Sequence, residues 1–435
     1  MNISLPGYRS SDKTYTANKA ELIRPATVGL IAGSAPKAQL DSIAHIFRLA
    51  AALLIFLKAC ASPEGPGNSE PVGREGIPVE SYAPAGDSSD ISGAGGFRVT
   101  DRGLYRVLSV YNPWQGARSE IFTYILADRD KELPADIPAG TVIRTPARSV
   151  ICMSTTHIAM IDLLGETASI SAVSGGGLVY NQVLRDRIDN GELPDIGYDN
   201  NLDYEKILEL NPDVILAYGV GAGSMAWLGR LSELGMNVVM VGEYLEKTPL
   251  EQAGWIRFIA HLFNRQEMAD SIFAGIENRY AELAHIAATA ETAPVVMSGL
   301  PWRGSWFVPG GRSHFASLVS DAGGRYLWED NRGRENFPVD IESVISRGRQ
   351  ADYWINTGTA QSAGDILRTD SRLGSLPPLA AGNIYNNNAR TNRYGGNDYW
   401  ESGIVNPHII LADLVSIFHR KLLPDHEQVY YRKLE

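Results

Sequence analysis

The 435-residue chain contains only two cysteines, Cys60 and Cys152. Two thiols exclude a disulfide-stapled scaffold and a multi-cysteine zinc or iron–sulfur site. Basic residues are scarcer than acidic ones, 39 against 50, which gives a formal net charge of -11. Because such a surface repels phosphate backbones, we expect no nucleic-acid partner.

Long hydrophobic runs are also missing. The most apolar stretch, residues 49–57, is about half as long as a bilayer-spanning helix. It is typical of the hydrophobic core of a signal peptide, so we interpret residues 1–59 as a signal-peptide region. This stretch is preceded by 48 residues, which a start placed too far upstream would explain.

A cysteine follows that run directly, in the sequence Leu-Lys-Ala-Cys at residues 57–60. This segment resembles a bacterial lipoprotein box, although Lys58 is unusual beside the processed cysteine. The resemblance implies that Cys60 is acylated and anchors the chain in a membrane. Residues 60–96, rich in Gly, Pro and Ser, are predicted to form a flexible tether. The alternative is a buried apolar helix with an unmodified cysteine.

The remaining chain predicts an α/β fold. Alternating runs at 105–110 and 121–126 indicate a small β-hairpin element, and after it short apolar runs alternate with helical lengths. We therefore expect two lobes with mostly parallel sheets, joined by one long rigid helix. The predicted strands are 149–153, 170–173, 213–218 and 237–241 in the first lobe, and 294–298, 325–328, 352–356 and 383–385 in the second.

The predicted organisation divides the chain at changes of composition and pattern. After the tether come the N-terminal lobe with its hairpin element (97–248), linking helices (249–290) and the C-terminal lobe (291–435). Apolar residues recur at helical spacing between 255 and 283, and Asn264 is the expected break between a shorter and a longer helix. Cys152 falls in an apolar strand pattern, which favours an inert core position over a nucleophile.

The two lobes share a faint internal repeat. Residues 204–208 form a short amphipathic pattern that bears Glu205 and leads to a strand opened by Asp213. Residues 341–345 repeat it with Glu342, followed by a strand opened by Asp352. Recurrence at the corresponding place in both halves indicates duplicated lobes.

These segments, taken in order between about 148 and 419, resemble the substrate-binding proteins of bacterial ABC importers for iron–siderophore complexes, haem and cobalamin. The most specific element is the segment 205–218. The resemblance implies a binder and no enzyme, a metal-chelate ligand held between two lobes, and a permease dimer as partner. It also implies that Glu205 and Glu342 dock on the two permease subunits. We expect a monomer on the periplasmic face of the inner membrane.

Candidate ligand contacts are side chains that follow predicted strands, because open parallel sheets bind ligands at the carboxyl ends of their strands. Aromatic and cationic groups among them suit a planar or charged chelate. The candidates are Thr155, His157, Tyr180, Tyr218, Trp302, Arg303, Trp306, Arg390, Arg393 and Tyr394.

Each candidate has an ordinary structural alternative. The loop 302–306 could cap the sheet, Arg390 and Arg393 could pair with surface acids, and His157 could bond the loop backbone instead of a metal. The sequence has no closely spaced pair of histidines that would indicate a site for a bare metal ion. The glycines at 175–177 are not followed by the lysine of a phosphate-binding loop. We expect no cofactor.

Two other classes of function stay open. Ser154 and His157 could suggest a hydrolase-like enzyme, but no nucleophile-elbow motif surrounds the serine. A structural lipoprotein with an idle cleft is the third alternative.

Overall fold

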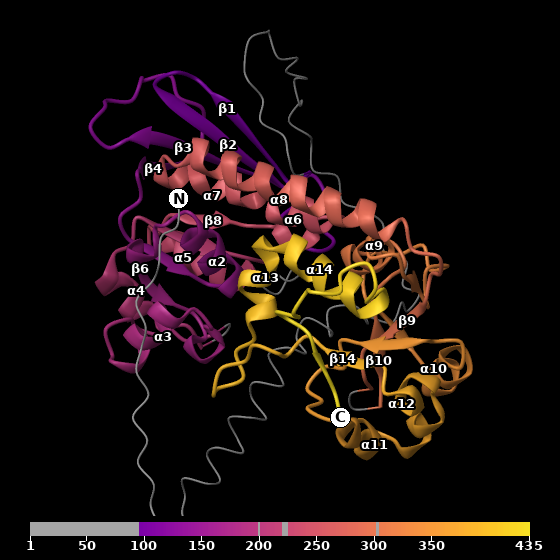
Figure 1. The fold of residues 1–435 in the computed structure, drawn as a ribbon. Coiled ribbons are helices and arrows are strands. Elements are labelled where there is room, and N and C mark those ends of the chain that lie inside the picture. Colours follow the sequence, from indigo (N-terminus) through magenta and orange to yellow (C-terminus); the bar gives the residue numbers. More distant parts are fainter. Residues whose placement is uncertain (1–94, 199–200, 220–224, 302–303) are drawn as a thin grey trace, which may run out of the picture. The chain divides into compact units, whose positions relative to one another are not determined.

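The computed structural model describes residues 95–198, 201–219, 225–301 and 304–435, and Figure 1 shows its fold. The predicted signal-peptide region, Lys58, Cys60 and nearly all of the tether lie outside the described residues. So do Trp302 and Arg303.

The first lobe contains a four-stranded parallel sheet in the order β6-β5-β7-β8. Its strands are β5 (Val150–Cys152), β6 (Ile170–Val173), β7 (Val214–Ala217) and β8 (Val238–Met240). Each lies inside the run that predicted it, and nearly all of their residues are buried, as in parallel sheets covered on both faces. Cys152 is buried in β5, as expected, and burial raises the pKa of its thiol.

Helices connect these strands and begin at capping side chains. Ser154, Asn181 and Asp203 each accept a hydrogen bond from a backbone N–H of the helix that follows. The helices are α2 (Thr155–Leu163), α3 (Gln182–Asp189), α4 (Tyr204–Leu210), α5 (Met225–Glu233), α6 (Pro249–Ala253) and α7 (Trp255–Phe263).

The hairpin element is a four-stranded sheet that packs beside the first lobe. Three strands are antiparallel neighbours, and the fourth runs parallel to the third. They are β1 (Phe97–Asp101), β2 (Tyr105–Tyr111), β3 (Ile121–Asp128) and β4 (Thr141–Thr145). Most of its buried residues share one hydrophobic core with α2 and α7.

The second lobe repeats the parallel sheet, in the order β11-β9-β13-β14, and adds the antiparallel edge strand β15. The strands are β9 (Val295–Ser298), β11 (Arg325–Tyr326), β13 (Tyr353–Ile355), β14 (Ile384–Asn386) and β15 (Arg432–Lys433). A separate antiparallel pair, β10 (Trp306–Val308) and β12 (Phe337–Val339), was not predicted. The helices are α9 (His314–Asp321), α10 (Ile341–Gly348), α11 (Ala363–Thr369), α12 (Pro377–Ala381), α13 (Ser402–Val405) and α14 (Pro407–Phe418).

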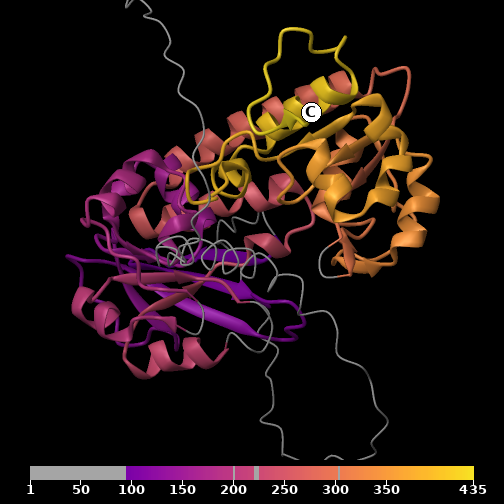
Figure 2. The ribbon, with the colours of Figure 1, turned by 90° about the horizontal axis from the view of Figure 1, so that it is seen from below.

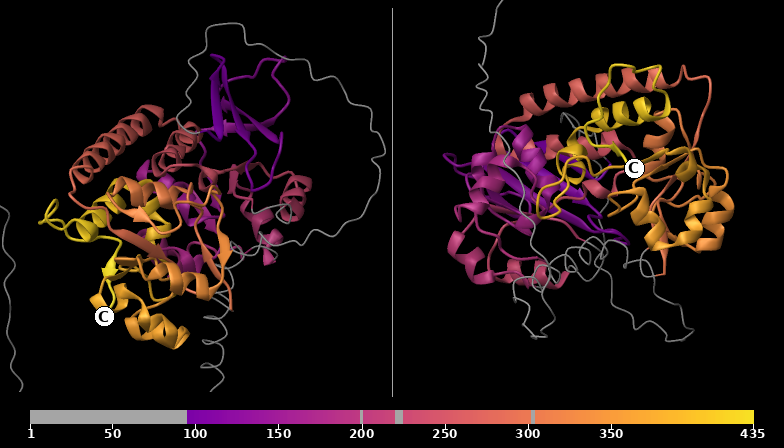
Figure 3. Two further views of the ribbon diagram at one scale, coloured as in Figure 1. Left: turned by 90° about the vertical axis from the view of Figure 1, so that its right-hand side faces the viewer. Right: turned by 60° about the horizontal axis from the view of Figure 1, so that its bottom comes forward.

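One long helix, α8 (Gln266–Ala287), links the lobes. The predicted break is confirmed, because Asn264 ends α7 in the left-handed conformation with φ 55°. At 22 residues, α8 is about 33 Å long. Its buried residues Ala269 and Phe273 belong to the first-lobe core, whereas Tyr280, Leu283 and Ala287 belong to the second. Helix α14 packs alongside α8 (Figure 2, Figure 3).

The internal repeat is confirmed in hydrogen bonds as well as in topology. Asp213 accepts from the N–H of Ser149 (3.2 Å), just before β5, and Asp352 accepts from the N–H of Val295 (2.8 Å), which begins β9. The side chain of Asn237 donates to the carbonyl of Asp213, as that of Asn383 does to Asp352. The same side chains therefore join equivalent strands in each lobe.

A buried carboxylate holds the C-terminal segment in place. Asp413 of α14 is fully buried and accepts hydrogen bonds from the N–H groups of Val429, Tyr430 and Tyr431 and from the His426 ring. These bonds position the segment that continues into β15, which pairs with β14.

Candidate functional site

The carboxyl edge of the first-lobe sheet carries a cluster of tyrosines. The hydroxyls of Tyr198 and Tyr218 lie 3.1 Å apart, and Tyr218 follows β7 directly. The hydroxyl of Tyr244, which lies four residues beyond the end of β8, donates to the carbonyl of Gly219. Burial raises the pKa of Tyr244. Three phenol groups thus converge around the end of one strand.

A polar chain lies at the end of β5. Ser154 and Thr156 bond through their hydroxyls (2.9 Å), and Thr156 donates to Glu243 Oε1 (2.6 Å). Glu243 is buried, and its other oxygen has no hydrogen-bond partner among the described residues. Burial raises the pKa of this carboxyl to about 7. Glu243 can therefore take up or release a proton near neutral pH.

His157 lies inside the protein and not at the sheet edge. Its side chain is 0% exposed within the first turns of α2. Burial lowers the pKa of the ring to about 3, an effect that the backbone of Leu216 partly offsets. The ring is neutral at physiological pH, and a ligand at the edge of the sheet would not reach it without a rearrangement.

The second lobe contacts the first through a segment that spans residues 387–401. The backbone N–H groups of Tyr180 and Asn181 donate to the two carboxylate oxygens of Glu401, at 2.7 and 2.6 Å. The Asn392 side chain donates to the carbonyls of Gly177 (3.1 Å) and Val179 (2.8 Å). These contacts hold the loop before α3 against the second lobe, and we call the segment 387–401 the inter-lobe bridge.

Four predicted ligand contacts belong to this bridge or touch it. Arg393 pairs with Asp189 of α3 (2.8 Å), and the Tyr394 hydroxyl donates to the same carboxylate (3.3 Å). Arg390 pairs with Asp398 (2.7 Å) and lies over the Tyr180 ring, 5.4 Å from its centre. Both arginines therefore have acidic partners within the protein: Asp189 is a surface acid, as the alternative interpretation expected, whereas Asp398 is buried. The structure brings Tyr180, Arg390, Arg393 and Tyr394 together.

Thr155 also contacts the bridge. Its hydroxyl donates to the carbonyl of Trp400 at 3.2 Å. The Trp400 ring is half-exposed, and it packs edge-on against Tyr399. This threonine therefore joins the region after β5 to the second lobe.

Trp306 lies in the second-lobe core instead of on the surface. Its side chain is 1% exposed, its indole N–H donates to the carbonyl of Ser298 (3.2 Å), and its ring stacks on Trp354 at 5.8 Å. The expected surface loop becomes strand at this residue, because β10 pairs with β12 and turns the indole inward. Tyr218 lies at the edge of the first-lobe sheet, directly after β7.

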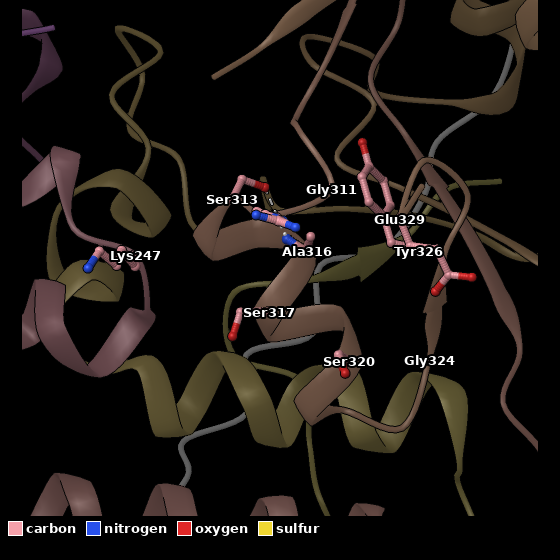
Figure 4. A pocket seen from close by; sticks show the side chains of 10 residues that line it. Lys247, Gly311, Ser313, Ala316, Ser317, Ser320, Gly324, Tyr326 and Glu329 are labelled. Carbon is pink, nitrogen blue, oxygen red and sulfur yellow. Dashed lines mark hydrogen bonds between the residues drawn. The ribbon is translucent and has the colours of Figure 1, made fainter. Parts of the chain in front are cut away.

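The structure also contains a polar pocket of ≈390 Å³ on the second lobe (Figure 4). Ser313, Ser317 and Ser320 line it at the start of α9 and along that helix, and Lys247 lines it from the segment before α6. No predicted contact lines this pocket, and none of its side chains has an unsatisfied buried polar atom. We therefore place the candidate site at the sheet edge.

Two features bear on metals and membranes. The described residues contain no group of three or more His, Cys, Asp or Glu side chains that could hold a metal ion. Among the helices that the structure describes, none is long and apolar enough to cross a bilayer.

Sequence reasoning missed several residues of this region. Glu243 and Tyr244 follow the predicted strand 237–241, so the same rule that selected Tyr218 would have found them. Tyr198 follows a single β-bridge between Val173 and Asp195, and a bridge of one residue pair has no strand pattern by which the sequence could reveal it. Glu401 had no local signal either, because its partners lie more than 200 residues away.

Comparison with known proteins is consistent with this geometry. Residues 150–390 match the model of a family described as periplasmic binding protein, more than half of the chain. An uncharacterized lipoprotein of Methanocaldococcus jannaschii is 24% identical over 347 residues, 75% of this chain and 81% of that protein. A second uncharacterized protein of that organism is 22% identical over 262 residues, 59% of this chain and 74% of that protein.

Solved structures share the fold. A periplasmic haem-binding protein of Pseudomonas aeruginosa aligns with a TM-score of 0.50 and 15% identity, covering 66% of this chain and 98% of that one. A periplasmic solute-binding protein of Veillonella parvula aligns with a TM-score of 0.50 and 13% identity, covering 65% and 84%.

The bridge carboxylate predicts a pH-dependent stability. Burial raises the pKa of Glu401 to about 8, and the nearby Asp398 adds to the effect. The pKa of Glu401 in the folded protein exceeds that of a glutamate in the unfolded chain. The contribution of Glu401 to the free energy of unfolding is therefore complete below about pH 4.5 and is lost as pH rises through about 8. We expect Glu401→Gln to remove this part of the pH dependence. It should also cost about 1–3 kcal/mol at pH 5, since an amide NH₂ would face a backbone N–H.

Urea denaturation at pH 5, 7 and 8.5 measures this effect. Glu277→Gln, an exposed change on α8, is the control and should leave the pH dependence unaltered. Identical pH profiles for wild type and Glu401→Gln would contradict the prediction.

Proposed function

Because this chain belongs to the periplasmic binding protein family, we propose that it captures an iron–siderophore complex or a related metal chelate and delivers it to an ABC permease. The observation that carries the proposal is the convergence of Tyr198, Tyr218 and Tyr244 at the carboxyl edge of the first-lobe sheet. Open parallel sheets bind ligands there. Tyrosines offer a chelate both flat apolar faces and hydroxyl groups.

A chelate suits this edge because it already holds its metal. The protein then has to contact a bulky, partly aromatic and often charged periphery, without building a coordination shell of its own. We propose that the ligand lies between the lobes, so that each supplies part of the contact. The proposed contacts are Tyr198 and Tyr244 together with the predicted residues Thr155, Tyr180, Tyr218, Trp302, Arg303, Arg390, Arg393 and Tyr394.

Two predicted contacts are left out of this set. His157 and Trp306 are both buried in the cores of their lobes. Trp306 also uses its only polar group on the Ser298 carbonyl. We propose that both residues stabilise the lobes beneath the site and do not contact the ligand.

Haem and cobalamin are alternative ligands of the same kind, since both are large metal complexes that suit an aromatic and cationic site. The Pseudomonas protein of similar fold binds haem. At 15% identity that likeness extends to the fold alone. A direct comparison of the three ligand types therefore decides between them.

An enzymatic function is the less favoured alternative. A hydrolase would need Ser154 hydrogen-bonded to a histidine base. The Ser154 hydroxyl instead bonds Thr156, and neither ring nitrogen of His157 makes a hydrogen bond of standard geometry with the described residues. We propose a binding protein that releases its ligand unchanged.

The ligand proposal predicts different outcomes for two tryptophans. Tyr218→Ala and Trp302→Ala should weaken chelate binding by about 1–3 kcal/mol and leave the fold intact. Trp306→Ala should instead lower the free energy of unfolding by about 3–5 kcal/mol, because its ring is buried. A thermal-shift panel of ferric siderophores, haem and cobalamin, followed by calorimetric titration, measures both effects.

Tyr105→Ala on β2 is the control for loss of an aromatic ring elsewhere. Turnover of the ligand, or the absence of binding to every member of the panel, would refute the proposal.

We further propose that the chain is a lipoprotein on the outer face of the inner membrane, anchored through Cys60. Tethering raises the local concentration of the binder beside its permease. Cys60→Ala should shift the protein from the detergent phase to the aqueous phase in phase-separation assays. Cys152→Ala is the matched control and should stay in the detergent phase. Unchanged partitioning of Cys60→Ala would rule out the anchor.

Docking on the permease is proposed to use Glu205 and Glu342. Both are exposed, and each is the second residue of its helix, after the capping residues Asp203 and Asp340. Glu342 also pairs with Arg372 at 3.0 Å. A two-fold permease would recognise such matched positions, since complementary charges set orientation and encounter rate more than affinity.

We expect the double variant Glu205→Arg with Glu342→Arg to abolish uptake and leave chelate affinity unchanged. Glu267→Arg, an exposed glutamate at the same position of α8, is the matched control and should transport normally. Uptake assays in cells and docking assays on the reconstituted permease measure the effect, and normal uptake by the double variant would overturn the assignment.

A further inference from the structure

The turn between β2 and β3, residues 112–120, reaches the carboxyl edge of the first-lobe sheet. Pro113 lies against Gly242, which follows β8: a Cβ added to Gly242 would come within 3.5 Å of the Pro113 Cα. Trp114 lies against Gly219, which follows β7, and a Cβ there would come within 3.1 Å of the Trp114 Cβ. The two glycines let the turn approach the ends of both strands closely.

The conformation of this turn is strongly specified. Three of its residues, Asn112, Gly116 and Ser119, have positive φ angles of 47°, 78° and 59°. The Asn112 N–H donates to the Glu120 carbonyl (2.8 Å), and the Glu120 N–H donates to the Asn112 side chain (3.1 Å). A turn held in this way presents its side chains in a fixed arrangement.

Trp114 fastens the turn to the first lobe. It is 9% exposed and belongs to the same core as Ile215 and Ala217 of β7 and Met240 of β8. Its ring packs edge-on against Phe122 at 5.8 Å. Gln115 is half-exposed, while Arg118 is exposed. The buried half of the turn thus anchors it beside Gly219, and the outer half carries an amide and a cation, Gln115 and Arg118.

This turn belongs to a part of the chain outside the family model, which begins at residue 150. The Methanocaldococcus lipoprotein matches 75% of this chain, about 326 of its 435 residues. Only 286 residues lie from 150 to 435, so that match includes residues before 150. The β1–β4 sheet is therefore at least partly shared with this relative.

We propose that the β2–β3 turn forms one wall of the ligand site, where Arg118 and Gln115 contact the periphery of an anionic chelate and determine which chelates are bound. This inference rests on the proposed function and names the charge class of its ligand. An arginine in a turn that reaches the tyrosine-bearing edge of the sheet favours anionic groups such as carboxylates or catecholates through charge-assisted hydrogen bonds.

Calorimetric titration of the full chain with four probes tests the inference. The probes are an anionic ferric tricatecholate, a ferric trihydroxamate without negative charge, haem and cyanocobalamin. We expect wild type to bind an anionic probe, the tricatecholate or haem, more tightly than the trihydroxamate. Arg118→Glu should weaken binding of that anionic probe about tenfold or more and affect the trihydroxamate less. Arg98→Glu, an exposed arginine on β1 of the same sheet, is the matched control and should bind like wild type.

Failure of the inference differs from failure of the proposed function. If wild type binds a probe but prefers the trihydroxamate or cobalamin, or if Arg118→Glu retains wild-type affinity for the anionic probe, the turn is not the selective wall. If wild type binds none of the four probes, the proposed function itself is overturned. Melting curves of both variants should match wild type, because both arginines are exposed.

Discussion

The architecture depends on one helix that is buried in two hydrophobic cores. The first half of α8 packs Ala269 and Phe273 into the first lobe, and its second half packs Tyr280, Leu283 and Ala287 into the second. A helix of about 33 Å shared in this way bends little, because any kink would break backbone hydrogen bonds and open one of the cores. The lobes therefore keep their sheet edges in a fixed relation, and the bridge from Glu401 to the Tyr180 and Asn181 backbone adds a second constraint.

Much of this fold could be predicted from the sequence, because its signals are local and repeated. The short β-branched runs became the strands of both parallel sheets, and Asn264 ended α7 as its tolerance of positive φ suggests. The repeat of a glutamate-bearing helix and an aspartate was enough to indicate duplication. The structure adds the reason for those aspartates, since Asp213 and Asp352 bond the N–H groups at the start of the neighbouring strands.

The candidate site was less predictable, because proximity to a strand end does not give the direction of a side chain. His157 follows strand β5 as predicted, and Trp306 was expected in the loop after β9, yet both are buried in the core. The first-lobe partners of Glu401 and Asn392 are separated from them by more than 200 residues, so no spacing could reveal these bonds between the lobes. The unpredicted strand β10 also changed the environment of Trp306, since pairing with β12 turned an expected surface loop into core.

Strand β15 has a consequence for how the second lobe is made. It follows every other strand of its sheet in the chain and covers the outer edge of β14, held there through Asp413. During vectorial synthesis on the ribosome, the β14 edge emerges before the strand that will cover it. An uncovered edge is a template for pairing with other chains. The interval between translation of β14 and β15 is thus the stage at which the nascent second lobe is most exposed to aggregation and most in need of a chaperone.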